Sequence, residues 1–385
     1  MKRTFVLVLG VAALLVGLRT HAHGTTLRMQ AVPSPAELEA RGLPPAPNVP
    51  YFSDAYQTWL RVIRAAQTPV GVDFVPMPSQ PHRVWQPDWA GPVLFAPGEK
   101  PLKIPEHRFA EIEGEWTVPF VLPTINCANK WEQEDGSNVW IALDGWSATF
   151  IAHDKGSDGK WHAYPASDLL NAGAESDVAC YGRGNPRGYR TSAFFWIEWA
   201  GVRNIPVTKQ HRNLPLKAGD TIYVRIAADT SGPHAWQRAT LWLVNVTQRY
   251  FVPPVKFDSG CLNCGNKYQE PATLFGNTAE WITEAIFYDA VKPSLPNTLA
   301  DFGTVTLSDA VATDQDGIVY EPGNPGPAKP NIDWMTWDGT PLDQGGTLWA
   351  CSYIDGPTTT SFVRAPYVVA TPGQQGGLEP KPKHC

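Results

Sequence analysis

The chain has 385 residues, enough for one large domain or two ordinary ones. Its formal net charge of −6 and the lack of a basic stripe argue against a nucleic-acid partner. Charged residues make up only 18%, while Pro (37), Gly (33) and Trp (16) are frequent, which favours a loop-rich all-β protein with aromatic side chains in cores or in a groove.

The first 22 residues have the pattern of a secretory signal peptide. Lys2 and Arg3 precede Phe5–Leu18, an apolar run of 14 residues that is too short to span a bilayer comfortably. Thr20–Ala22 follows as a small-x-small cleavage site. Because no later stretch suits a membrane helix, the sequence predicts a secreted or periplasmic protein with no membrane partner.

Residues 23–86 differ in amino-acid composition and pattern from the rest of the chain. Prolines are frequent, and the stretch Asp54–Ala66 repeats apolar residues at helical spacing, with Asp54 placed to cap a helix. We interpret residues 23–86 as a leader or propeptide-like segment that either packs on the following domain or is removed from it.

From about Trp89 onward, short runs of β-branched and aromatic residues are separated by turn residues. Many short strands without intervening helices predict an all-β sandwich or barrel over residues 87–370, followed by a loose tail at 371–385. The expected strands are Val93–Phe95, Phe109–Val118, Val139–Leu143, Thr191–Trp199, Thr221–Ala227, Thr240–Val246, Glu280–Phe287, Phe302–Leu307, Ile332–Trp337 and Thr347–Tyr353.

Two of these strands carry Trp and an acidic residue on one face, a third carries Glu280 and Glu284 on one face, and the opposite faces are apolar, since side chains alternate along a strand. Independently solvated faces would give the same alternation, but such faces usually carry Lys, Thr and Ser. We therefore expect one shared cleft, in which crowded carboxyl groups raise one another's pKa and form an acid/base pair. The side chains expected there are Trp140, Asp144, Trp196, Glu198, Glu280 and Glu284.

Six segments, in order, resemble those of the glutamic peptidases, also called eqolisins or the scytalidopepsin B-like group. Each segment alone is a weak signal, but six in order over roughly residues 87–355 are fairly specific. They are Asp88–Leu94 (DWAGPVL), Gly114–Pro119 (GEWTVP), Trp140–Gly145 (WIALDG), Trp196–Trp199 (WIEW), Ala218–Ile222 (AGDTI) and Ala279–Glu284 (AEWITE). The resemblance implies a lectin-like, concanavalin-type sandwich of two antiparallel sheets, an active site on the concave sheet, and a leader that is removed.

The resemblance also implies a chemistry. The family's catalytic Glu falls on Glu284, which would take a proton from the attacking water and return one to the leaving amine. The family's Gln, which orients the water and donates to the oxyanion, falls on His153, or on Ala152 or Asp154 if the register slips by one. No Gln occurs between residues 144 and 200. Trp89, in the first segment, joins the expected cleft.

The sequence therefore predicts a secreted, acid-acting glutamic endopeptidase that cleaves polypeptides with Glu284 and His153. One alternative is a catalytically altered homologue that binds peptides or glycans without turnover. Another is a glycoside hydrolase, since Trp-rich clefts stack sugars. Glu280 and Glu284 would lie ~13 Å apart at their Cα atoms, too far for that chemistry unless the side chains converge, whereas Glu198 with Glu284 is easier.

Six cysteines in a secreted chain predict disulfides whose pairing the sequence does not choose. They are Cys127, Cys180, Cys261, Cys264, Cys351 and Cys385. The Cys261-x-x-Cys264 pair lacks a second close pair to complete a zinc site, and the histidines have no ligand spacing. We expect no metal, no cofactor and a monomeric protein.

Overall fold

The computed structural model describes residues 32–71, 82–83, 89–124, 134–155, 159–181, 188–199, 203–206, 216–258, 273–285, 299–336 and 347–369. Ser34–Cys385 forms one compact unit, which is the part discussed below. The predicted signal peptide, the predicted tail and four of the cysteines lie outside the described residues. The other two, Cys180 and Cys351, are not free thiols, and the disulfide pairing stays a prediction.

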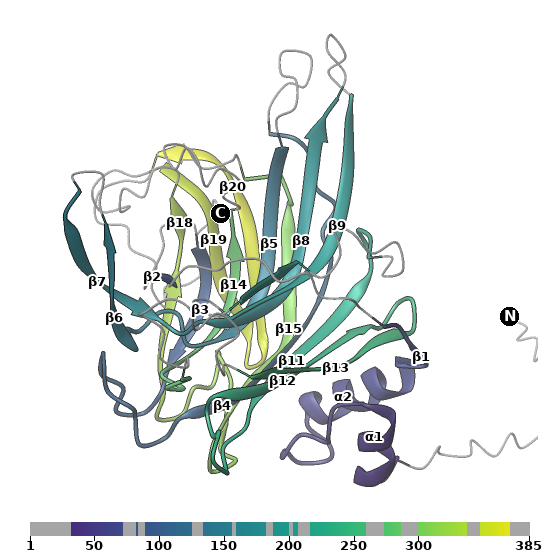
Figure 1. Cartoon of the computed structure of the whole chain (residues 1–385). Coiled ribbons are helices and arrows are strands. Elements are labelled where there is room, and N and C mark those ends of the chain that lie inside the picture. Colours follow the sequence, from purple (N-terminus) through teal and green to yellow (C-terminus); the bar gives the residue numbers. More distant parts are fainter. Residues whose placement is uncertain are drawn as a thin grey trace, which may run out of the picture. The chain divides into compact units, whose positions relative to one another are not determined.

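Within the described residues, twenty strands form three sheets (Figure 1). The ten-stranded sheet contains, in spatial order, β1 (Thr68–Pro69), β13 (Tyr250–Asp258), β12 (Arg238–Asn245), β11 (Thr221–Ala228), β4 (Phe109–Thr117), β15 (Thr304–Asp314), β20 (Thr359–Val369), β19 (Thr347–Gly356) and β18 (Met335–Thr336), with β16 (Val319–Tyr320) on β15. The seven-stranded sheet contains β10 (Arg203–Pro206), β9 (Tyr189–Trp199), β8 (Leu170–Cys180), β5 (Glu134–Leu143), β14 (Thr278–Glu284), β3 (Trp89–Phe95) and β17 (Lys329–Asp333). The three-stranded sheet contains β2 (His82–Arg83), β7 (Trp161–Ser167) and β6 (Phe150–Lys155).

The two larger sheets share one hydrophobic core. On β5, Val139 and Ile141 point into this core, whereas Trp140 between them belongs to a separate apolar cluster on the outer face. On β4, Ile112 and Trp116 point into the same core from the ten-stranded sheet. Neighbouring strands in both sheets are antiparallel, apart from the short parallel pair β1–β13. The predicted all-β sandwich of two antiparallel sheets is confirmed.

Three long strands are missing from the sequence prediction, namely β8, β13 and β20, of which β20 has the β-branched and aromatic residues of a typical strand. β8 reads LNAGAESDVAC, which has a single β-branched residue and no aromatic residue, so it lacks the usual strand signal. β13 contains Pro253 and Pro254, and proline is not expected within a central strand because it has no N–H to donate to the neighbouring strand. The structure accommodates them because the β12–β13 register shifts between Leu241 and Leu243.

Two helices lie in the described part of the predicted leader. α2 (Asp54–Ala65) confirms the predicted helix, but its N-cap is Ser53, whose hydroxyl accepts from the Tyr56 amide, and not Asp54. α1 (Pro35–Arg41) is not expected from the sequence because it spans only 7 residues of a Pro-rich stretch. No helix within the described residues is long and apolar enough to cross a membrane.

Candidate active site

The outer face of the seven-stranded sheet carries an apolar cluster that is separate from the main core. We call this surface the tryptophan face. Its buried apolar members are Trp89, Val93, Trp140, Ala142, Leu169, Phe194, Trp196 and Ile282, with Phe95 and Trp146 packed against them. Strand register adds Glu198, Glu280 and Glu284, because residues paired directly across antiparallel strands point to the same face. Aromatic and acidic side chains expected to lie together therefore share one surface.

A glycine makes room for the largest side chains of this face. Gly173 of β8 pairs with Trp140 on one side and with Trp196 on the other. A Cβ atom at Gly173 would lie 2.6 Å from the Cβ of Trp140 and 2.3 Å from the carbonyl oxygen of Val139. Since real Cβ contacts are longer than this, only glycine fits between the two tryptophans.

Glu284 is held at both carboxylate oxygens by neutral donors. Trp89 Nε1 donates to Oε1 at 3.0 Å, and Trp140 Nε1 donates to Oε2 at 2.9 Å. The two indole rings meet edge to face with centroids 4.9 Å apart, which fixes both donors. Burial raises the pKa of Glu284 to about 7, while hydrogen bonds from Trp89, Trp140 and Asn138 oppose that rise. As a residue, Glu284 is nonetheless only partly buried.

Glu198 lies on the same face and is coupled electrostatically to Glu284. Its strand partner is Asn171, whose hydrogen bond favours the ionised form. Burial, and then the negative charge of Glu284, raise the pKa of Glu198 to about 8. Of the two carboxyl groups, Glu284 therefore loses its proton first as the pH rises, and Glu198 still carries one.

Glu280 lies beneath the tryptophan face, and its side chain is not accessible from solvent. Its side chain is fully buried, and Oε1 accepts hydrogen bonds of 2.7 Å from the Thr278 hydroxyl and from the Trp146 amide. Burial raises the pKa of Glu280 to about 8. The ring of Trp146 packs on that of Trp89, with centroids 6.0 Å apart. Glu280 thus fixes the loop whose aromatic ring supports a donor to Glu284.

Asp144 binds backbone amides. β5 ends at Leu143, and Asp144 takes a φ of 59°, in the left-handed region that Asp tolerates. Its buried carboxylate accepts from the amides of Phe275, Gly276 and Asn277, at 2.7, 3.1 and 2.6 Å. The strand alternation predicted this side chain beside Trp140, but the strand ends one residue too early. Asp144 ties the end of β5 to the segment before β14.

His153 belongs to a different sheet from Glu284. It lies on β6, opposite Ala163 of β7, in the three-stranded sheet. Its side chain lies outside the described residues, so the predicted pairing with Glu284 stays a prediction.

Sequence reasoning does not find Asn138 and Asn171, which pair with Glu284 and Glu198. Each side-chain carbonyl is buried without a hydrogen-bond partner, as are Trp196 Nε1 and Oε2 of Glu280, so four buried polar atoms of this face are unsatisfied among the described residues. The alternation of Asn171 and Gly173 with Leu170 and Ala172 is the signal that could have revealed β8.

One group within the described residues has metal-binding geometry, away from the tryptophan face. Ligand atoms of His107, Asp314 and Asp316 lie within 4.8 Å of one another. The Asp314 oxygens already accept from two backbone amides and from the hydroxyl of Tyr320. Its carboxylate is therefore occupied in shaping a turn, and nothing links it to the site.

These features define a two-sheet β-sandwich with a carboxylate-centred site on one outer face. A sequence model of the Peptidase A4 family matches residues 87–343, more than half of the chain. The chain belongs to the Peptidase A4 family. Among solved structures it is similar to SCP-B, a member of the Eqolisin family of peptidases solved with the tripeptide Ala-Ile-His. The identity is 16%, the match covers 72% of this chain and 98% of that one, and the TM-score is 0.43. Comparison with curated proteins found no match.

Proposed function

We propose that the chain is a secreted, monomeric glutamic endopeptidase that hydrolyses peptide bonds in polypeptides with Glu284 as general base and acid. Family membership supports a peptidase. The observation that carries the role of Glu284 is the geometry of its carboxylate, which two indole N–H groups hold in place while burial raises its pKa. Such a group can take a proton from water and deliver it to a leaving amine.

The oxyanion needs a donor, and His153 is our candidate because it stands where the family has Gln. An imidazole ring has an N–H donor in its neutral and in its protonated form, so it can donate to a developing negative charge, as the amide of Gln would. Trp196 Nε1 and the carbonyls of Asn138 and Asn171 are buried and without partners in the described part of the chain, so they are suited to holding an ordered water beside the carboxyl groups.

The pKa of Glu284 bears on the working pH. A general base must be ionised, and burial raises the pKa of Glu284 to about 7. The acid optimum implied by the family resemblance would require ionisation at much lower pH. The active form, with Glu284 ionised and Glu198 protonated, is most populated between about pH 7 and 8. We therefore propose an optimum nearer neutrality than the resemblance implies.

The test is hydrolysis of a denatured protein by the purified chain from pH 2 to 9. We expect Glu284→Gln to lose about 10³-fold in kcat/KM, since general acid–base groups contribute ~10²–10⁴-fold. His153→Ala should lose about 10²-fold, as removal of an oxyanion donor does. Glu106→Gln, at an exposed position, is the matched control and should be unchanged. Equal rates for wild type and Glu284→Gln would contradict the proposal.

A binding module is the second candidate, because a face rich in Trp with unsatisfied polar atoms also suits a peptide or glycan ligand. It predicts saturable binding of denatured protein or oligosaccharide, measured by Trp fluorescence, with no turnover at any pH.

A further inference from the structure

The N-terminal segment Ser34–Val70 covers the outer face of the ten-stranded sheet. This face and the tryptophan face lie on opposite sides of the main core, to which both sheets contribute. We propose that the segment is a permanent clamp of the domain that stays bound to the working protein and leaves the tryptophan face open. Its binding is independent of the proposed function; only the statement about the working protein rests on it.

The clamp buries apolar side chains on the outer face of the sheet. Tyr223, Val244 and Phe251 form one buried cluster with Trp59 and Ile63 of α2. The strand neighbours of Tyr223 point into the main core, so Tyr223 itself points outward and is covered only because the segment lies over it. Loss of the segment would expose an apolar patch on this face.

The clamp also supplies a missing charge. The outer face of β4 carries three glutamates in alternation, and Glu113 and Glu115 are only 2% and 6% exposed. A buried carboxylate requires a cation or several donors. Arg225 of β11 provides one cation, with Nη2 2.6 Å from Oε2 of Glu111. Arg61 of α2 provides the other, to Glu115. The sheet alone therefore leaves Glu115 without its cation.

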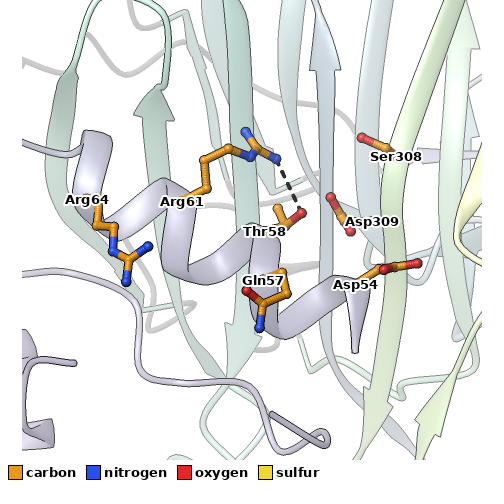
Figure 2. A pocket seen from close by; sticks show the side chains of 7 residues that line it. All are labelled: Asp54, Gln57, Thr58, Arg61, Arg64, Ser308 and Asp309. Carbon is orange, nitrogen blue, oxygen red and sulfur yellow. Dashed lines mark hydrogen bonds between the residues drawn. The ribbon is translucent and has the colours of Figure 1, made fainter. Parts of the chain in front are cut away.

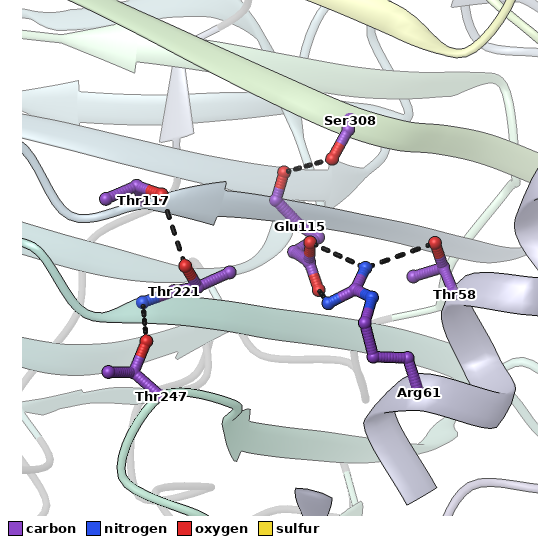
Figure 3. Close-up of polar contacts among 7 residues, drawn as sticks. All are labelled: Thr58, Arg61, Glu115, Thr117, Thr221, Thr247 and Ser308. Carbon is purple, nitrogen blue, oxygen red and sulfur yellow. Dashed lines mark hydrogen bonds and ion pairs between the residues drawn. The ribbon is translucent and has the colours of Figure 1, made fainter. Parts of the chain in front are cut away.

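The Arg61–Glu115 contact is bidentate (Figure 3). Nη1 lies 2.6 Å from Oε2 and Nη2 lies 2.8 Å from Oε1. Nη2 also donates to the hydroxyl of Thr58, one helical turn earlier, at 3.2 Å. Two parallel hydrogen bonds fix the orientation of the helix on the sheet as well as its distance.

The backbone of β15 is shaped for this helix. The β15–β4 register shifts between Ser308 and Val311, and within that bulge Asp309 adopts a φ of 53°. Asp309 is only 5% exposed, and its carboxylate accepts a hydrogen bond from Thr58 of α2. Figure 2 shows both residues with Arg61 around the pocket, of about 670 Å³, between α2 and this bulge. A bulge that brings the Asp309 carboxylate to the Thr58 hydroxyl indicates that this strand is shaped to hold the helix.

Three further contacts extend the clamp beyond α2. The carbonyl of Pro45 accepts from Arg225 Nη1 at 2.6 Å. The amide of Val70 donates to the Phe251 carbonyl at 2.9 Å, so that β1 covers the sheet edge. Gly42, with a φ of 68°, lies so close to β13 that a Cβ there would be 2.7 Å from Cδ of Pro254. The segment is therefore fitted to the sheet along its length.

The first test cuts the chain and asks whether the pieces stay together. A specific protease site is inserted directly after Gly71, the folded protein is cleaved, and native size-exclusion chromatography is followed by intact mass measurement. We expect the N-terminal piece to co-elute with the remainder. Separation of the piece, with an unchanged melting temperature of the remainder, would overturn the clamp.

Turnover is measured in the same samples. Hydrolysis by protein whose mass still includes Ser34–Val70 supports the clamp. Hydrolysis that begins only after the segment has gone overturns it and leaves the proposed function intact. If neither sample hydrolyses protein, the proposed function fails and co-elution still decides the clamp.

The second test is a double-mutant cycle on melting temperature with Arg61→Met, Glu115→Gln and both together. We expect Arg61→Met to lower the melting temperature by about 2 °C or more, and the double variant to fall by less than the sum. Arg64→Met is the matched control, since Arg64 lies on the same helix and pocket and has no ion pair within the described residues. Additive effects, or equal effects of Arg61→Met and Arg64→Met, would overturn the assigned contact.

Discussion

Each outer face of the sandwich carries a glutamate held by hydrogen bonds, but the donors are of opposite kinds. On the ten-stranded sheet, Glu115 is bound by the guanidinium of Arg61. On the seven-stranded sheet, Glu284 is bound by two neutral indole N–H groups. Among the described residues, no cation contributes to the pKa shift of Glu284 or of Glu198.

The difference shows what makes a buried carboxylate reactive. At Glu115 the cation satisfies the charge of the carboxylate and ties the helix to the sheet, so this carboxylate serves structure. Neutral donors fix the position of the group and leave burial free to raise its pKa toward neutrality, where it can exchange protons. Glu284 and Glu198 are in the second situation.

Removal of one neutral donor tests this contrast most strongly. Trp140→Phe keeps the ring but loses the hydrogen bond to Glu284 Oε2. We expect kcat/KM to fall about 10²-fold, and the acid limb of the pH–rate profile to move to higher pH, because the lost donor favoured the ionised form.

Trp334→Phe is the matched control, since its Nε1 donates to the carbonyl of Ser352 in the ten-stranded sheet. It should leave rate and profile unchanged. A Trp140→Phe variant with the wild-type acid limb would show that the indole donors do not set the pKa of Glu284.

The separate roles of Glu284 and Glu198 can be distinguished by measuring activity at high pH. We expect wild-type activity to rise as the pH rises through about 7, where Glu284 ionises, and to fall through about 8, where Glu198 loses its proton. Glu198→Gln mimics the protonated form and cannot ionise, so its activity at pH 9 should exceed that of wild type, by roughly tenfold for one pH unit above a pKa. If both proteins decline together above pH 8, another group limits the rate.

Stability against pH gives the smallest predicted effect. Burial raises the pKa of Glu280 to about 8 in the folded protein, above its usual value of 4.5. The folded state therefore binds this proton more tightly than the unfolded state, and the stabilisation is complete below about pH 4.5 and lost as the pH rises toward 8. Glu280→Gln, which does not titrate, should show a shallower decline of melting temperature between pH 5 and 8. An unchanged slope would mean that Glu280 is ionised in the folded protein.

Much of the fold follows from sequence alternation, as the strands of the tryptophan face show. Ile141 and Trp140 lie on opposite faces as expected, because one side of β5 packs on the core. The Asp144 contact could not be predicted, since it depends on where the strand ends. β8 is not predicted because the residues that fit beside Trp140 are small, and small residues have low β-propensity.

The clamp could not be predicted for a different reason. Outward-facing glutamates such as Glu113 and Glu115 read as a solvated face, and only the fold brings the helix near them. The role of His153 likewise depends on how one small sheet meets a larger one, which no local pattern determines.

The place of β14 in its sheet has a consequence for the order of assembly. It lies between β3 and β5, which come far earlier in the chain; Glu284 is 195 residues from Trp89 and 144 from Trp140. A growing chain can make both donors long before it makes the carboxylate that they hold. No fragment that ends before residue 278 contains the complete site, and closing such long loops is slow. If the chain is a peptidase, its active site is complete only after most of its own sequence has been synthesised.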